Sequence, residues 1–97
     1  MVVDVGLRIS AQSAFLGLIH PEMRLIKIKC IERVIHLTVV FSSQPTEKAI
    51  EDVSVAATEI IADFPDAKKI SENIIVSDGP LPVEDLLEEG WVYRRAE

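Results

Sequence analysis

The clearest hydrophobic pattern in the chain runs from Thr46 to Phe64 and predicts one long amphipathic helix. Apolar residues recur there every three or four positions. Thr46 is the expected N-cap, and Pro65 is expected to end the helix because proline disfavours helical geometry in the residue before it. We expect one side of this helix to be buried in the core. That side carries Ile50, Val53, Ala57, Ile60, Ile61 and Phe64.

The opposite side of the same helix is mostly acidic. A helical wheel places there Lys48, Glu51, Asp52, Val55, Glu59 and Ala62, with Asp63 at its edge. Such a side is often only solvated, and a single exposed valine is ordinary. The functional interpretation is a partner-binding surface in which Glu51, Asp52, Glu59 and Asp63 surround the small apolar spot of Val55.

Two stretches alternate between apolar and polar residues and predict strands, at Arg24–Cys30 and Val34–Ser42. The connection between them is short, so they should form an antiparallel hairpin. A loop of either two or four residues gives the same parity. One face of the hairpin, which we expect to form the core, then holds Ile26, Ile28, Cys30, Ile35, Leu37, Val39 and Phe41.

Shorter signals flank these elements. Ser10–Ile19 is predicted to be a first helix with Ser10 as its N-cap, preceded by a disordered leader or extra strand over residues 1–8. Lys69–Ser77 is predicted to be a third strand. Its apolar face is interrupted by Glu72, which indicates a sheet edge or a bulge.

The C-terminal part is predicted to hold one helical turn at Val83–Gly90 and a last strand at Trp91–Arg95, antiparallel to the third strand. The resulting order is α-β-β-α-β-β. It predicts an α+β protein, a two-layer α/β sandwich with a mainly antiparallel sheet and one long helix packed on it. We expect a single domain over residues 1–97.

Composition narrows the function classes. The chain is 48% hydrophobic but 5% aromatic, so the core should be aliphatic. A single cysteine, Cys30, excludes an internal disulfide and a cysteine-cluster zinc site, and it suits a reducing cytoplasm. We find neither an apolar run of about 20 residues nor a signal peptide, so we predict a cytoplasmic protein with no membrane partner.

The charge is unevenly distributed. Up to Gln44 there are five basic and three acidic residues, whereas from Pro45 onward there are five basic and thirteen acidic residues. An acidic half repels nucleic-acid phosphates and favours cationic partners, although solubility alone explains the same charge. We therefore expect a cationic protein partner and no nucleic acid.

Candidate chemistry is sparse. Cys30 and His36 would lie on opposite faces of the hairpin, so they could not act together as a nucleophile and its general base. His20 is best explained by a loop or capping role. We predict no catalytic, metal or cofactor-binding residue and no cofactor. The outer face of the hairpin is basic but lacks the aromatic residues that RNA-binding sheets use. It carries Lys27, Lys29, His36 and Thr38, with Arg33 near the turn.

A second acidic cluster precedes the aromatic Trp91 and Tyr93. It consists of Glu84, Asp85, Glu88 and Glu89. Aromatic residues beside charges are common in protein interfaces, which makes this cluster and Trp91 further candidates for partner binding. Alternatively, Trp91 caps a core that is poor in aromatic residues.

Three stretches carry a family resemblance: RISAQSAFLG, PTEKAIEDVSVAATEIIADFPD and GWVYRR. From Arg8 onward the chain resembles small acidic bacterial proteins found beside toxin genes or on mobile gene cassettes, including immunity proteins of contact-dependent inhibition systems. The resemblance implies a non-enzymatic protein that binds a toxin domain. It assigns no individual residue.

Two functions follow as hypotheses. The first is an immunity or antitoxin-like inhibitor that holds an acidic surface against a cationic toxin domain, mimicking nucleic-acid phosphates. The second is a self-associating, homodimeric structural protein from a mobile gene cassette. An enzyme would need a pocket with convergent polar groups, which sequence does not display.

Overall fold

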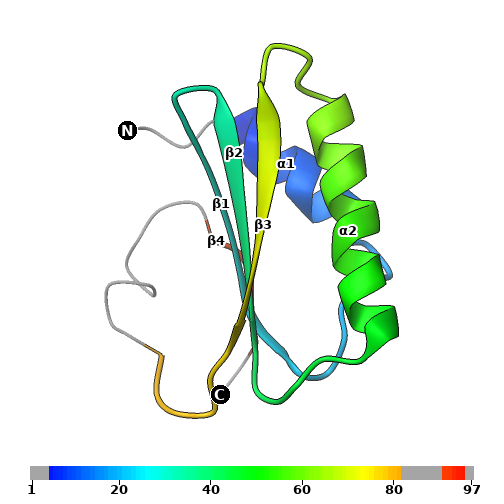
Figure 1. Cartoon of the computed structure of the whole chain (residues 1–97), viewed down its shortest axis with the longest axis vertical. Coiled ribbons are helices and arrows are strands. Elements are labelled where there is room, and N and C mark those ends of the chain that lie inside the picture. Colours follow the sequence, from blue (N-terminus) through cyan, green and yellow to red (C-terminus); the bar gives the residue numbers. More distant parts are fainter. Residues whose placement is uncertain (1–4, 82–90, 96–97) are drawn as a thin grey trace.

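A computed structural model describes residues 5–81 and 91–95, and it places two helices on one face of a sheet (Figure 1). The elements follow one another as α1 (Val5–Ala14), β1 (Met23–Ile31), β2 (Val34–Phe41), α2 (Glu47–Ala62), β3 (Lys69–Val76) and β4 (Trp91–Arg94). The predicted mixture of two helices and four strands is therefore confirmed in these residues, while the finer details match only in part. The predicted helical turn at 83–90 lies outside them.

The hairpin is confirmed. β1 and β2 pair antiparallel, with Ile28 opposite Leu37 and Cys30 opposite Ile35, as the parity argument requires. The turn between them consists of Glu32 and Arg33, whose φ angles of 51° and 68° give the left-handed geometry of a tight two-residue hairpin turn.

The sheet is mixed, rather than mainly antiparallel, and its strand order is β3-β2-β1-β4. β2 and β3 pair parallel, because α2 supplies the long crossover that a parallel pair needs. The prediction that the last strand pairs with the third is wrong. β4 pairs antiparallel with β1, on the opposite side of the sheet from β3.

The first helix also differs from its prediction. α1 begins at Val5, so residues 5–8 are helical and Ser10 lies inside the helix, not at its N-cap. The helix turns Leu7, Ala11 and Ala14 into the core, and Phe15 follows them. Residues 1–4 lie outside the described part of the chain.

The core lies between the helices and the inner face of the sheet and is aliphatic, as predicted. Ile60 and Val53 of α2 and Leu37 and Val39 of β2 are at most 1% exposed. Within the described residues, no helix is long and apolar enough to cross a membrane.

Candidate partner-binding surface

The N-terminus of α2 is fixed by its cap. Thr46 is the N-cap as predicted, and its Oγ1 accepts a hydrogen bond from the Ala49 amide at 3.1 Å. Glu47 lies in the first turn, where a negative charge favours the helix dipole. The first turn is thus stabilised both by a side-chain cap and by charge.

Asp52 departs most from its predicted position. The helical wheel places it on the solvated side of α2, but the structure buries it, leaving the residue 5% exposed. Its two oxygens are both engaged: His20 Nε2 lies 2.7 Å from Oδ2, and Lys48 Nζ lies 2.6 Å from Oδ1. Asp52 therefore joins α2 to the loop after α1 instead of presenting a charge to solvent.

These contacts set the ionisation of the cluster. The hydrogen bond from Lys48, followed by the one that joins His20, lowers the pKa of Asp52 below its ordinary value of 3.8. The hydrogen bond to Asp52 and the attraction of its charge raise the pKa of Lys48 above 10.5. Asp52 and Lys48 are consequently both charged across the physiological range.

Ile50 was expected in the core and is exposed, whereas Asp52 was expected in solvent and is buried, and both differences have the same physical reason. α1 and the loop at His20 pack against the flank of α2 that carries Asp52, and this covers that flank. The other flank points toward β3, where Ser54 Oγ donates a hydrogen bond to Glu72 Oε1 at 2.8 Å. Ile50 lies one turn from Ser54 on this less covered flank and is 40% exposed, contrary to the prediction that it faces the core.

The C-terminal end of α2 is joined to α1. Ser10 Oγ donates a hydrogen bond to Asp63 Oδ2 at 2.6 Å. Asp63 is the C-cap residue; its amide donates a hydrogen bond to the Ile60 carbonyl, and the next amide, of Phe64, donates to the Ile61 carbonyl. Asp63 remains exposed, so one of its oxygens orders the helix end while the carboxylate still borders solvent.

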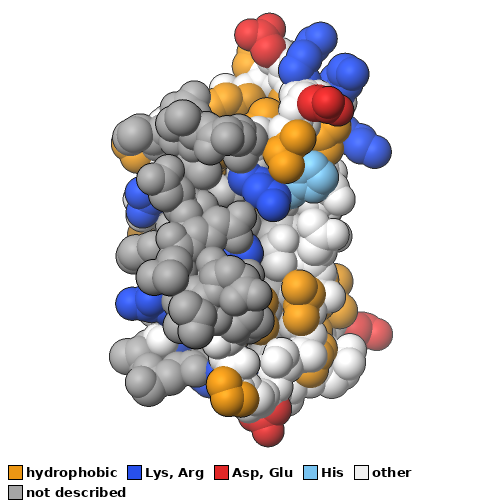
Figure 2. Space-filling model, turned by 90° about the vertical axis from the view of Figure 1, so that its left-hand side faces the viewer, with side chains coloured by type: hydrophobic (Ala, Val, Ile, Leu, Met, Phe, Trp, Pro, Cys, Tyr) orange, Lys and Arg blue, Asp and Glu red, His pale blue; other side chains and the backbone are white. Residues whose placement is uncertain are grey.

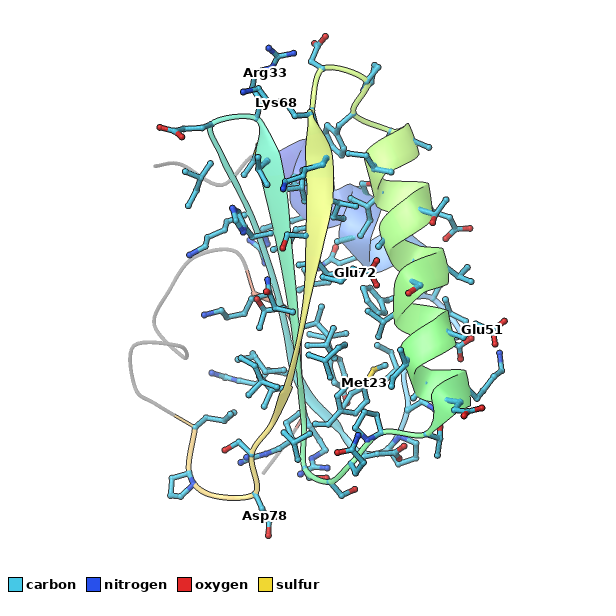
Figure 3. All side chains as sticks on the ribbon, viewed as in Figure 1. Met23, Arg33, Glu51, Lys68, Glu72 and Asp78 are labelled. Atoms are coloured by element: carbon cyan, nitrogen blue, oxygen red, sulfur yellow. The ribbon has the colours of Figure 1, made fainter. Side chains whose placement is uncertain are left out.

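Between these two ends, three exposed side chains at successive turns form what we call the α2 ridge: Glu51, Val55 and Glu59. Val55 is 45% exposed. Figure 3 shows Glu51 on the side of α2 that faces away from the sheet. In the described part of the chain, neither Glu51 nor Glu59 is paired with a cation.

A groove of about 400 Å³ runs beside the ridge, between α1 and α2. Its polar lining consists of Ser10, Ser13, Glu59 and Asp63. Two carboxylates at the border of one groove form an environment that suits the head of a lysine or arginine side chain.

For the other predicted partner-binding residues, the structure does not show a position at this surface. Glu84, Asp85, Glu88 and Glu89 lie outside the described residues. The backbone of Trp91 begins β4 and pairs with Lys27 of β1. The ridge and the neighbouring Asp63 are therefore the parts of the predicted acidic surface that the structure describes as exposed.

The outer face of the sheet is polar and basic in part. Figure 2 shows Lys and Arg side chains distributed over this face, together with hydrophobic and uncharged ones. Lys27, Lys29, His36 and Thr38 are half-buried on it. Arg24 is buried, and its Nη1 donates hydrogen bonds of 2.7 Å to the carbonyls of Ser77 and Gly79, which fixes the segment after β3.

The pairing of Cys30 with His36 is excluded by the register. Lys29 is opposite His36, while Cys30 is opposite Ile35 and packs against the core from the other face. Cys30 also lines a mostly apolar cavity of about 300 Å³ with Leu7, Phe64 and others. Among the described residues, no group of three or more His, Cys, Asp or Glu side chains is placed to hold a metal ion.

These features describe a small α+β protein whose exposed acidic ridge stands on a helix fixed at both ends. The MafI2 immunity protein family matches residues 4–97, so the chain belongs to this family. The resemblance to toxin-immunity proteins is thereby confirmed at the level of the family. A comparison with curated proteins finds no match to the chain.

Proposed function

We propose that this protein is a non-enzymatic inhibitor that binds a cationic toxin domain through the α2 ridge and blocks its activity in the cytoplasm. Membership of an immunity protein family supports binding to a toxin as the role. The choice of surface rests on the exposure of Glu51, Val55 and Glu59, and on the finding that neither carboxylate forms an ion pair among the described residues.

The ridge has the composition that fast and specific association requires. Unpaired carboxylates attract a basic partner from a distance and raise the association rate, an effect that salt screens. Val55 supplies an apolar contact between the charges, and such contacts are excluded from water at the centre of an interface. Glu59 and Asp63 beside the groove offer an acceptor pair for a basic side chain of the toxin.

The ridge is also held in place before binding. Thr46 and the Asp52 cluster fix the first half of α2, and the hydrogen bond between Ser10 and Asp63 fixes its end. A helix held in this way loses little conformational freedom on binding, so more of the interaction free energy appears as affinity.

The inhibitory mechanism that follows is mimicry of a phosphate backbone. If the toxin domain binds nucleic acid, its basic surface would contact the carboxylates of the ridge in place of phosphates. An unlabelled oligonucleotide should then compete with the immunity protein for the toxin. A toxin that binds both at once would exclude mimicry while leaving the binding proposal intact.

The test uses any toxin domain found to be encoded beside the gene, together with a double charge reversal, Glu51→Lys with Glu59→Lys. We expect the double variant to lose at least tenfold in affinity, to lose protection of cells that express the toxin, and to show a weaker salt dependence. The matched control is Glu32→Lys with Asp66→Lys, which makes the same change in net charge at the exposed hairpin turn and in the loop beside it.

Circular dichroism must show that both double variants fold. Equal loss of affinity in the control would mean that overall charge, and not the ridge, drives binding. Unchanged affinity and salt dependence in the ridge variant would refute the ridge as the binding surface. Failure of the unmodified protein to bind any neighbouring toxin would refute the inhibitor role itself.

A further inference from the structure

β3 presents an open edge in the part of the chain that the structure describes. It pairs there with β2 on one side, and no described strand pairs with its other side, which we call the β3 edge. The end of the strand is apolar and exposed: Ile74, Ile75 and Val76 are 37%, 45% and 48% exposed. Proteins usually protect such an edge with charges, proline or a bulge, because it is a template for pairing with another chain.

The backbone of β3 is directed in a way that suits pairing. At the end of the strand, the Ser77 amide donates to the Phe41 carbonyl of β2 at 2.8 Å. Because amides alternate in direction along a strand, odd-numbered residues from Lys69 to Ser77 turn toward β2, and even-numbered residues such as Ile70, Ile74 and Val76 turn toward the β3 edge. Just before the strand, the Lys68 amide instead donates to the Arg33 carbonyl at 2.7 Å, so only the side chain of Lys68 is available to a partner. The register between β2 and β3 is continuous from Lys69 to Val76, so no bulge interrupts this alternation.

The charges at the two ends of β3 have opposite signs. Lys68 and Lys69 lie at its start, and Asp78 follows its end. Figure 3 shows Lys68 and Asp78 at opposite ends of the molecule. The backbone on both sides of Asp78 is fixed by the hydrogen bonds of Arg24 to Ser77 and Gly79. Neither Lys68 nor Asp78 has a described ion-pair partner.

We propose that the partner of this edge is a second copy of the same chain, with the two β3 strands antiparallel about a two-fold axis that passes beside Asn73. Only an antiparallel arrangement brings the basic start of one strand to the acidic end of the other. In this register Lys68 lies opposite Asp78 of the second copy, and Ile70 lies opposite Val76 of the second copy. Each of these favourable pairs occurs twice, as in any isologous interface.

Neighbouring registers are poorer. Residues that pair across the two-fold axis must have their side chains on the same face of the sheet. The alternative registers therefore have the axis beside another residue of β3, one position away or more. An axis at Glu72 would place the two Glu72 carboxylates opposite each other, and like charges directly opposite are destabilising. An axis at Ile74 would place Lys68 opposite Pro80, which removes both ion pairs.

The contact is small beside a standard interface of about 1,600 Å². We therefore expect a reversible dimer whose population rises with protein concentration. This inference does not depend on the proposed toxin contact, since the ridge and the β3 edge share no residue.

Sedimentation velocity over a wide concentration range tests the dimer, and a charge swap tests its register. Lys68→Glu alone and Asp78→Lys alone should each weaken dimerisation about fivefold, because each disrupts two cross-strand ion pairs. Lys68→Glu combined with Asp78→Lys should restore it, since the pairs re-form with reversed sign. Glu51→Lys on the ridge is the control and should leave dimerisation unchanged.

A second variant blocks the edge itself. Ile74→Pro removes an amide that points away from β2, so the strand pair within the protein should survive while dimerisation is lost. A protein that stays monomeric at its highest soluble concentration would overturn the proposal, as would a dimer that none of these variants weakens. Failure of the double swap to restore dimerisation would overturn the register. A monomer whose toxin binding is lost with Ile74→Pro would assign the edge to the toxin instead.

Discussion

The α2 ridge and the β3 edge are both exposed, but they offer a partner different kinds of contact. The ridge presents two carboxylates around one valine in the interior of a helix, where backbone groups bond within the helix itself. The edge presents backbone donors and acceptors beside three consecutive apolar residues. The ridge therefore selects a partner by charge, whereas the edge selects by strand geometry, and salt should weaken the first far more than the second.

The largest effect is expected on the buried side of the ridge helix. Ile60→Ala should lower the free energy of unfolding by about 2–5 kcal/mol, because Ile60 is 0% exposed and the substitution leaves a cavity. Val55→Ala, on the exposed side of the same helix, should change stability by no more than about 0.5 kcal/mol. Urea denaturation measures both. A large stability loss from Val55→Ala would show that Val55 supports the fold rather than a partner contact.

The next prediction concerns the free energy of unfolding at low pH. The pKa of Asp52 is lowered in the folded protein, so its contribution is present above its unfolded pKa near 3.8 and is lost as pH falls through its folded value. Stability should therefore fall below about pH 4, and Asp52→Asn should reduce the steepness of that fall. Urea titrations at several pH values measure it. Identical slopes in both proteins would contradict the assignment of the titration to Asp52.

A smaller effect is expected from the cap. Thr46→Ala should cost about 1 kcal/mol, because the Ala49 amide loses its side-chain acceptor. The ridge should then bind the toxin more weakly through fraying of the first turn, while dimerisation at the β3 edge stays the same. Thr46→Asp, which retains an acceptor, is the matched control. Equal losses in the two variants would point away from capping.

The smallest effect is expected where the two regions meet. Ser54→Ala removes the exposed hydrogen bond between α2 and Glu72, which reaches from β3 toward the helix (Figure 3). Stability, toxin binding and dimerisation should each change by no more than about 0.5 kcal/mol. A clear change in both kinds of binding would show that the ridge and the edge are coupled, and not independent.

Local patterns predicted the local structure well. Thr46 caps α2 because its hydroxyl can accept a hydrogen bond from a free amide of the first helical turn. The hairpin prediction holds because side chains alternate strictly between the two faces of a strand. Glu72 marked an edge strand because a carboxylate on an inner face must reach solvent or a polar partner. Each of these predictions depends on neighbours that are close in sequence. The extent of a single domain over residues 1–97 stays a prediction.

The predictions that were wrong depend on contacts between residues that are distant in sequence. A helical wheel gives the angle of Asp52 but not the position of His20, which approaches from the loop after α1. Ser10 resembles a cap by residue type, yet its hydroxyl bonds Asp63 at the far end of α2. The pairing of β4 with β1 depends on a strand order that alternation alone does not encode. For α2, the helical wheel therefore predicted the exposure of Glu51, Val55, Glu59 and Asp63 correctly, but it was wrong for Asp52.

The pairing of β4 with β1 has a consequence for synthesis on the ribosome. Leu25 pairs with Arg94, so the sheet is completed by a strand that emerges after the other three. Until then a nascent chain holds the hairpin, α2 and β3, but it lacks Val92, which is buried in the core. The immature protein would then have two open strand edges, at β1 and at β3. A chaperone that shields exposed strands should therefore engage it most strongly just before Trp91 emerges from the ribosome.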